Sequence, residues 1–476
     1  MRDLAKSASF NRDNLLSLFN LNEEDVMEID VSHKSDAVYI YIKLNKQEHK
    51  CPVCESKTTS VKAYTNKKIL HSLLSNYPCY IIYRARRYVC ETCRKTFYEH
   101  NPFTHKNMKI SVACVSNVLL DLKKVSETFT SVANRYNLSS TTVASIFDSH
   151  VVMSRKMLPE LLCIDECYAF SSSQGNYVCV LIDFETKNTI DLLPSRRKQD
   201  LIRYFDRIPL EERKKVKMVC IDMWETYRVV AKAKLPNAQI ALDKFHVLQE
   251  LRRKVIKVRN TVMNKNKGYK ITKKLEIEAK RSKEARIKLY NYKQKNKNYY
   301  LLKKFRWLLL INEEKRKTSL DMNNKKKFNR TLNQYTNFYD LLNMILNIDP
   351  QLKKAYYFLI KVDEFFREAN INNAKVKIDK IIDYALHSEV VELNSYGHTL
   401  MRWRREIINS FYIINEVDEY GEVFSRKINN GIAENKNRTL KLIKNHSNGY
   451  RNWERFRNRS LYVLNDDATY NLYPVK

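Results

Sequence analysis

Two C-x2-C pairs are the clearest chemical signature in this sequence. The pairs are Cys51–Cys54 and Cys90–Cys93, and residues 55–89 lie between them. Two pairs of this kind supply four thiolates to one tetrahedral Zn²⁺, and a four-cysteine shell leaves no open position for a substrate. The pattern therefore predicts a structural zinc. Four unrelated buried thiols are the alternative interpretation.

Two aspartates follow short apolar runs that are typical of buried strands. Asp165 follows Leu161–Ile164, and Asp222 follows Val219–Ile221. A carboxylate at the end of a buried strand is costly unless it is paired or bound to metal. If the two strands are neighbours, both carboxylates point into one crevice, where they can share divalent cations for in-line phosphoryl displacement. Mg²⁺, or Mn²⁺ in its place, suits such oxygen ligands.

A third carboxylate, Glu434, falls in the first turn of the last expected helix, and Arg438 and Lys441 share its face. A carboxylate that heads a basic stripe fits metal chemistry beside a phosphodiester backbone. However, Glu at a helix start is also ordinary compensation of the helix dipole, and the residues alone favour that interpretation. Three acidic residues elsewhere in the region are rival candidates: Asp183, Asp243 and Glu166, which should point away from Asp165 on an extended strand.

The charge balance points to a polyanionic partner. Lys and Arg number 86 against 53 Asp and Glu, a formal net charge of +33. Nucleic acid is the commonest partner of so basic a chain, although a Lys-rich proteome would also raise the charge. Arg86 and Arg87 lead into the second cysteine pair and suit phosphate contacts.

A helix-turn-helix is expected beyond the cysteines. Thr130–Tyr136 and Ser140–His150 are predicted helices around a short turn. In such a motif the second helix enters the major groove of DNA. Plain packing of a small helical bundle is the alternative. The second helix would present three polar side chains to DNA: Thr141, Thr142 and Ser145.

Several classes of protein are disfavoured. The sequence has no apolar stretch long enough to span a membrane, and Met1–Lys6 lacks the apolar run of a signal peptide. The sequence thus predicts a cytoplasmic protein with no membrane partner, whose ten cysteines are not a disulfide framework. Only six glycines occur, and no glycine-rich phosphate-binding loop is present.

The elements that must position the carboxylates follow a mixed pattern. Between residues 160 and 246 the order strand-strand-strand-helix-strand-helix-strand predicts an α/β domain. The expected strands are Leu161–Ile164, Tyr177–Phe184, Thr189–Leu193, Val216–Ile221 and Gln239–Leu242. Residues 247–415 are predicted to be almost entirely helical, with basic clusters such as Lys325–Lys327. These clusters fit either a solvated surface or a DNA contact.

The sequence resembles transposases of the ISL-three type of bacterial insertion sequences. The resemblance spans nearly the whole chain and rests on the order and spacing of several short motifs. These are the two cysteine pairs, Arg86–Cys90, Phe97–Glu99, Ile164–Glu166, Ile221–Trp224 with Tyr227, Pro236–Ala238, Asp243–His246, Asn430–Asn435 and Asn448–Trp453.

The resemblance implies an RNase H-like catalytic domain with a DDE triad. Position by position, the triad is Asp165, Asp222 and Glu434, so Glu434 becomes a catalytic candidate only through the family. Asp222 and Glu434 are 212 positions apart, a gap that the family fills with a helical insertion. The expected domains are a zinc-ribbon-like module at 1–105, a helix-turn-helix at 106–158, an α/β RNase H-like domain at 159–254 and 401–476, and an all-α insertion at 255–400.

The function that these features predict is DNA transposition. The enzyme would bind terminal inverted repeats and catalyse metal-dependent cleavage and strand transfer. Its partners would be double-stranded transposon ends and target DNA, and a homodimer or higher assembly is expected because two ends must be joined. A catalytically inactive DNA-binding regulator and a structure-specific nuclease are the alternatives.

Overall fold

The computed structural model describes residues 21–74, 77–106, 108–172, 175–417 and 423–475. The sequence also predicts a short helix around Asn14–Phe19, and these residues lie outside this part. The chain divides into two compact units, each described by itself below. Unit 1 comprises Met1–Arg155, Cys167–Val178 and Lys436–Lys476, and unit 2 comprises Lys156–Glu166 and Cys179–Asn435.

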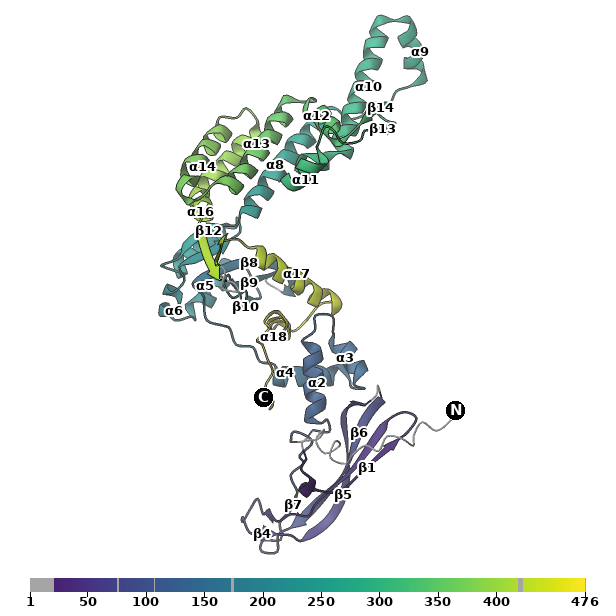
Figure 1. The fold of residues 1–476 in the computed structure, drawn as a ribbon, viewed down its shortest axis with the longest axis vertical. Coiled ribbons are helices and arrows are strands. Elements are labelled where there is room, and N and C mark those ends of the chain that lie inside the picture. The colour runs from purple at the N-terminus through teal and green to yellow at the C-terminus, as the bar shows by residue number, and fades with distance from the viewer. Residues whose placement is uncertain (1–20, 75–76, 107, 173–174, 418–422, 476) are drawn as a thin grey trace. The chain divides into compact units, whose positions relative to one another are not determined.

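A twisted sheet carries the cysteine pairs in unit 1. Its strands follow the order β1-β2-β6-β5, and β7 pairs with Arg87–Val89 at the end of β6. Figure 1 shows the long strands of this sheet, with β1, β5 and β6 labelled. Side chains at alternate positions of β6, from Cys79 through Ile81 and Tyr83 to Ala85, are buried against Ile40 and its neighbours of β2. This two-residue period fixes one face of the sheet as core. The elements are η1 (Glu23–Asp25), β1 (Val26–His33), β2 (Val38–Leu44), β3 (His49–Lys50), β4 (Lys57–Thr58), β5 (Val61–Leu74), β6 (Tyr77–Val89) and β7 (Thr96–Tyr98).

Three helices follow the sheet, and a fourth from the C-terminal region completes their core. They are α2 (Val112–Leu122), α3 (Phe129–Arg135), α4 (Ser140–His150) and α18 (Trp453–Leu464). Val118, Leu119, Val143 and Phe147 pack together with Tyr462 of α18. Helix α18 was not predicted, because its three arginines interrupt the apolar period.

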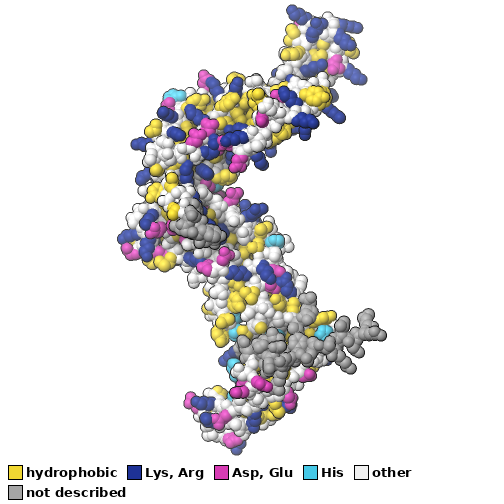
Figure 2. All heavy atoms as spheres, in the orientation of Figure 1, with side chains coloured by type: hydrophobic (Ala, Val, Ile, Leu, Met, Phe, Trp, Pro, Cys, Tyr) yellow, Lys and Arg dark blue, Asp and Glu magenta, His cyan; other side chains and the backbone are white. Residues whose placement is uncertain are grey.

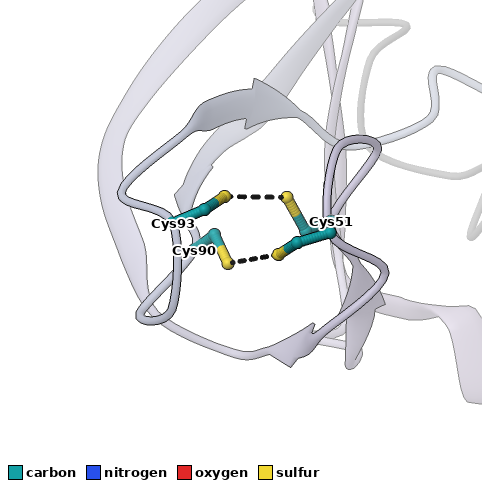
Figure 3. Close-up of side chains that lie close together, drawn as sticks. Cys51, Cys90 and Cys93 are labelled. Carbon is teal, nitrogen blue, oxygen red and sulfur yellow. Dashed lines mark hydrogen bonds between the residues drawn. The ribbon is translucent and has the colours of Figure 1, made fainter.

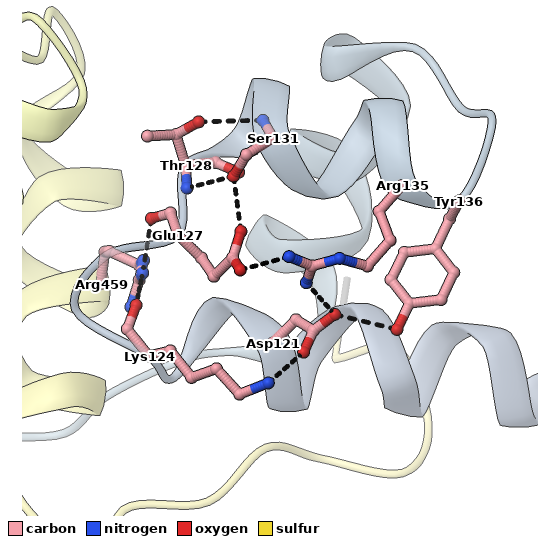
Figure 4. A network of polar contacts seen from close by, with 8 residues as sticks. All are labelled: Asp121, Lys124, Glu127, Thr128, Ser131, Arg135, Tyr136 and Arg459. Carbon is pink, nitrogen blue, oxygen red and sulfur yellow. Dashed lines mark hydrogen bonds and ion pairs between the residues drawn. The ribbon is translucent and has the colours of Figure 1, made fainter. Parts of the chain in front are cut away.

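A polar network holds the same helices together (Figure 4). Asp121 and Glu127 both accept hydrogen bonds from the Arg135 guanidinium, and the Tyr136 hydroxyl donates to Asp121. The guanidinium of Arg459, from α18, is only 1% exposed and donates to the backbone carbonyls of Lys124 and Glu127, at 2.8 and 3.1 Å. Buried charges persist in proteins when they are hydrogen-bonded in this way.

A five-stranded mixed sheet forms the centre of unit 2, in the order β10-β9-β8-β11-β12. The end of β8 and the start of β9 fall within residues 167–178, which are assigned to unit 1. The strands are β8 (Leu161–Ser172), β9 (Gly175–Asp183), β10 (Thr189–Leu193), β11 (Met218–Ile221) and β12 (Gln239–Leu242). β11 lies between β8 and β12 and pairs with both in parallel, whereas β9 and β10 are antiparallel. The predicted mixed α/β arrangement is confirmed. The first strand is longer than predicted and continues past Ile164 to Ser172.

One face of this sheet is covered by helices that the apolar pattern predicted. Leu162, Ile164, Val219 and Ile221 face a core that includes side chains of α5 and α7. These helices and their neighbour are α5 (Lys198–Asp206), α6 (Leu210–Lys214) and α7 (Glu225–Lys234). By strand alternation, Cys163, Asp165 and Cys220 belong to the opposite face.

The region after β12 is largely helical, as predicted, but includes short hairpins. Its helices are α8 (Lys244–Lys265), α9 (Lys273–Arg281), α10 (Lys283–Lys304), η2 (Arg306–Leu310), α11 (Glu313–Ser319), α12 (Phe338–Leu346), α13 (Pro350–Glu368), α14 (Ile371–Leu386), α15 (Val391–Arg402) and α16 (Arg404–Asn409). Two hairpins, β13 (Lys327–Asn329) with β14 (Gln334–Thr336) and β15 (Ile413–Val417) with β16 (Val423–Lys427), precede α17 (Gly431–His446). The strands β13 and β14 have three residues each, too few for an alternating pattern of apolar and polar residues to be visible in the sequence. In the part of the chain described, no helix has the length and apolarity to cross a membrane.

Candidate active site and zinc site

The two cysteine pairs form loops of the same geometry. In each loop the amide of the first cysteine donates to the residue five positions on, Ser56 or Lys95, at 2.9 Å. Each loop also has a residue with positive φ directly after its second cysteine: Glu55 and Arg94, both at 58°. Residues are rarely held in this conformation without a structural reason. The shared geometry aims the thiols of both loops at one point.

The four sulfur atoms fit a zinc ion. The Sγ atoms of Cys51 and Cys93 are 3.6 Å apart, those of Cys54 and Cys90 are 3.5 Å apart, and all four lie within 4.8 Å of one another (Figure 3). Tetrahedral zinc with Zn–S bonds of about 2.3 Å places its sulfurs about 3.8 Å apart. The donor set and its spacing therefore agree with the predicted structural zinc.

Arg86 does not serve the DNA contact expected from the sequence. Its side chain is 3% exposed, and its guanidinium lies 3.3 Å from the Glu99 carboxylate and donates to the carbonyls of Leu44 and Asn45. A buried guanidinium with these partners stabilises the module and cannot reach a phosphate at the surface. The neighbouring Arg87 remains partly exposed and donates to Thr96.

Three aspartates lie side by side across the parallel strands of unit 2. Cys163 of β8 pairs with Cys220 of β11, so Asp165 and Asp222 are each two positions further along adjacent strands. Ile221 pairs with Leu242 of β12, and Asp243 comes next. Adjacent strands lie about 4.8 Å apart, so the three carboxylates share one edge of the strands. All three are at least 90% buried.

The segment that leads into α17 lies against this edge. The Asn430 side chain donates to the carbonyl of Ile164 at 3.2 Å, and the Cys163 thiol donates to the carbonyl of Asn429. A hydrogen bond from the Asn430 backbone also reaches Asp243 and partly offsets the effect of burial, which raises the pKa of that carboxyl. The first turn of α17 thus begins beside the aspartates.

Glu434 lies in that first turn and is exposed. Within the described residues, the four cysteines are the one group of three or more potential ligands whose donor atoms all lie within 4.8 Å. The structure therefore brings Asp165 and Asp222 together on neighbouring strands, but it does not gather Glu434 with them into a tight three-carboxylate cluster.

The Asp222 carboxyl is strongly perturbed. Burial, together with the nearby charges of Glu166 and Asp165, raises its pKa to about 7. A nearby negative charge disfavours ionisation of a carboxyl, which is why Asp165 and Glu166 raise the pKa of Asp222. Such a concentration of negative charge is typical of a cation site and of functional sites generally.

Sequence reasoning did not identify the surroundings of Glu166. Its backbone amide donates to Asp165, whereas its carboxylate forms an ion pair with Arg196 and lies 3.5 Å from the Tyr227 hydroxyl. The Arg196 guanidinium stacks 4.6 Å from the Trp224 ring and lowers the pKa of Asp222, opposing the effect of burial. In the sequence, only its position next to Asp165 suggests Glu166 as a site residue, and the alternation of side chains along a strand predicts that it points away from Asp165.

The perturbation of Asp222 predicts a pH-dependent stability. Its folded pKa of about 7 exceeds the ordinary value of 3.8, so ionisation destabilises the fold progressively as the pH rises from about 4 to about 7. In the absence of added Mg²⁺ and at about pH 8, Asp222→Asn should increase the free energy of unfolding by at most about 4 kcal/mol. The measurement is the midpoint temperature of thermal unfolding, which should rise accordingly. The gain should vanish near pH 4 and shrink with excess Mg²⁺. A gain independent of pH would contradict this origin.

The side chains expected to contact DNA lie on two helices. In α4, Ser139 caps the helix, Thr141 and Ser145 are exposed, and Thr142 is partly exposed. The opposite side of α4 is buried in the helical core. Arg438 and Lys441 are exposed on α17.

Comparisons with known proteins agree with these features. Residues 162–460 match a family described as "Transposase", and residues 47–93 match one described as "zinc-finger of transposase IS204/IS1001/IS1096/IS1165". The chain is also similar to a protein from Bordetella parapertussis described as "Transposase for insertion sequence element IS1001". The two are 22% identical over 425 residues, which cover 88% of this chain and 89% of that protein. The second match contains all four cysteines of the zinc site.

Proposed function

This chain belongs to the insertion-sequence transposase family of the ISL-three type, and we propose that it binds the ends of its element and catalyses their cleavage and strand transfer. The observation that carries the proposal is the position of Asp165 and Asp222, each two residues beyond the paired Cys163 and Cys220 of adjacent parallel strands, where the pKa of Asp222 is raised. Two buried carboxylates so placed are expected to hold divalent metal.

The residues present fit a hard cation. Asp165 and Asp222 offer carboxylate oxygens, which Mg²⁺ and Mn²⁺ prefer. Bound there, the metal would supply an activated water or hydroxyl nucleophile and stabilise the charge that develops on the phosphate. The proposed third ligand is Glu434, assigned through the family resemblance. Asn430, bonded to Ile164 of β8 and to Asp243 after β12, supports this assignment because it holds the start of α17 at the edge of the strands that carries the aspartates.

The proposed catalytic fold is RNase H-like, interrupted between Asp222 and Glu434 by the helical region. Support comes from the mixed sheet, with its parallel β8, β11 and β12 and its antiparallel β9 and β10. The helices between residues 255 and 400 then form the insertion. The five-part domain division expected from the sequence stays a prediction.

End recognition is proposed to rest on unit 1. Thr141, Thr142 and Ser145 on α4 would read base edges in the major groove, as the second helix of a helix-turn-helix does. Arg87 in the zinc module and Arg438 and Lys441 on α17 would contact phosphates, which position the protein without specifying sequence. Since two ends must be joined, the active form is proposed to be a homodimer or a higher assembly on DNA.

A strand-transfer assay tests the proposal. The purified protein is mixed with Mg²⁺, a supercoiled target plasmid and labelled duplexes that carry the inverted repeats flanking its gene. We expect cleavage at the repeat and joined product, whereas duplexes of scrambled sequence should give neither. Cleavage without joining would identify a nuclease, and binding without cleavage would identify a regulator; either result overturns the proposal.

A further inference from the structure

A cavity of about 800 Å³ opens in the helical region of unit 2. Its walls are the hairpin β13–β14, the loop before it, the end of α10 and the start of α12. Its volume is in the upper part of the range for ligand sites, about 300–1,000 Å³. Neither the proposed triad nor the zinc site uses this cavity.

The lining combines positive charge with aromatic rings. Lys304, Lys325, Lys327 and Arg330 line the cavity together with aromatic side chains that include Phe328 and Phe338, and no Asp or Glu is among the described residues that do so. Phe328 is 50% exposed, with the Tyr335 ring centroid 5.3 Å away, and contact of its apolar ring with water is unfavourable. A lining of cationic side chains and exposed aromatic rings, with no acidic side chain among them, is complementary to an anionic ligand that has flat apolar faces.

Hydrogen bonds hold the walls in place. The buried Asn337 side chain donates to the carbonyls of Met322 and Asn324, at 3.0 Å each, and so fixes the loop that precedes the hairpin. The Tyr300 hydroxyl donates to the Asn329 side chain at 3.3 Å, which ties the hairpin to α10. Leu332, in the hairpin turn, is anchored in the core of unit 2. A site whose walls are already positioned loses less entropy when it binds a ligand.

Lys326 behaves differently from the lysines on either side of it, so the cavity does not simply share the charge of a uniformly solvated basic surface. Lys326 points to Asp340 and pairs with it at 3.0 Å, whereas Lys325 and Lys327 on either side line the cavity. Within the described chain, no ion pair involves Lys325, Lys327 or Arg330. Around α9 and α10, Figure 2 likewise shows many Lys and Arg side chains and few acidic ones. The cavity therefore lies in a part of the surface that favours a polyanion.

We propose that this cavity binds unpaired nucleotides of single-stranded DNA. Phe328 and Phe338 would stack on bases, and Lys304, Lys325, Lys327 and Arg330 would neutralise the backbone. Unstacked bases present the flat faces that such rings need, which duplex DNA does not. The choice of DNA rests on the proposed function, because a strand-transfer enzyme handles strands that leave the duplex; the cavity itself is defined by the lining residues.

The test is binding of an oligothymidine of about 12 nucleotides to the full-length protein, measured by fluorescence anisotropy. Phe328→Ala should weaken binding about 5- to 150-fold, since stacking on one aromatic ring is worth about 1–3 kcal/mol. Lys327→Gln should weaken binding and reduce the slope of log affinity against log salt by about 0.7. Lys326→Gln is the matched control, and its affinity should equal that of the wild type.

Two comparisons make the result decisive. Binding of the terminal-repeat duplex, and strand transfer by the wild type, are measured in parallel. If the wild type joins ends but Phe328→Ala and Lys327→Gln bind oligothymidine normally, the cavity proposal fails and the function stands. Equal losses in Lys326→Gln and Lys327→Gln, or tighter binding of oligouridine than of oligothymidine, would also overturn it. If the wild type neither binds nor joins repeats, the proposed function fails separately.

Discussion

Asp222→Asn is expected to lower DNA cleavage by at least about 10³-fold while binding of the terminal repeats stays within about twofold of the wild type. A metal that stabilises the developing charge contributes several kcal/mol to the transition state, and each 1.36 kcal/mol is a factor of ten in rate. Asn offers one neutral oxygen in place of a carboxylate beside Asp165, so it holds the cation poorly. Cleavage of labelled repeat duplexes and their electrophoretic mobility shift provide the two measurements.

Asp183→Asn is the matched control for this experiment. Asp183 is also a buried aspartate at the end of a strand of the same sheet, but its carboxylate accepts hydrogen bonds from the Glu185 amide and the Thr186 hydroxyl within its own turn. An Asn at that position keeps an acceptor, so cleavage should persist. Retained cleavage in Asp222→Asn, or an equal loss in Asp183→Asn, would refute the assignment of Asp222 as a metal ligand.

Cys51→Ser is expected to remove the zinc and to unfold the N-terminal module. Structural zinc contributes on the order of 10–16 kcal/mol to the folding of small zinc domains, more than the whole stability of most domains. The two cysteine loops contain few apolar side chains of their own, so metal is their main support. Zinc content by elemental analysis, limited proteolysis between residues 50 and 100, and repeat binding should all change together.

Cys79→Ala separates loss of zinc from loss of any thiol. Cys79 lies in the core of the same sheet, where burial raises the pKa of its thiol to about 11 and keeps it neutral. That variant should keep one zinc per chain and lose only modest stability, about 1 kcal/mol for the removed sulfur. Full zinc content in Cys51→Ser would rule out the four-cysteine site.

The sequence predicted best what depends on local spacing. The four cysteines, the mixed α/β pattern, the strands Thr189–Leu193 and Gln239–Leu242 and the aspartates that follow apolar runs are all visible in short windows, and the structure agrees with them. Asp165 and Asp222 could be nominated as a pair because each follows apolar residues. Their actual adjacency depends on the register of β8 and β11, which no local window contains.

Long-range contacts account for the features that the sequence did not predict. Arg86 looked like a DNA contact because it stands among basic residues, but its partner Glu99 follows β7, and its other acceptors are the carbonyls at the end of β2. Arg196 reaches Glu166 from a strand end thirty positions away. Glu434 has no local feature that distinguishes it from a residue compensating a helix dipole, so only the family resemblance could single it out.

The contacts of Arg459 also mean that the helical core of α2 to α4 can be completed only after α18 has been synthesised. Helices α2 to α4 are translated early, but Arg459 and Tyr462, which bond the backbone of the α2 region, lie beyond 302 intervening residues (151–452). At about 5–20 residues per second, translation reaches α18 roughly 15–60 s later. A nascent chain therefore carries an incomplete helical core while all of unit 2 is made. A premature stop codon that spared every proposed catalytic carboxylate would leave that core open.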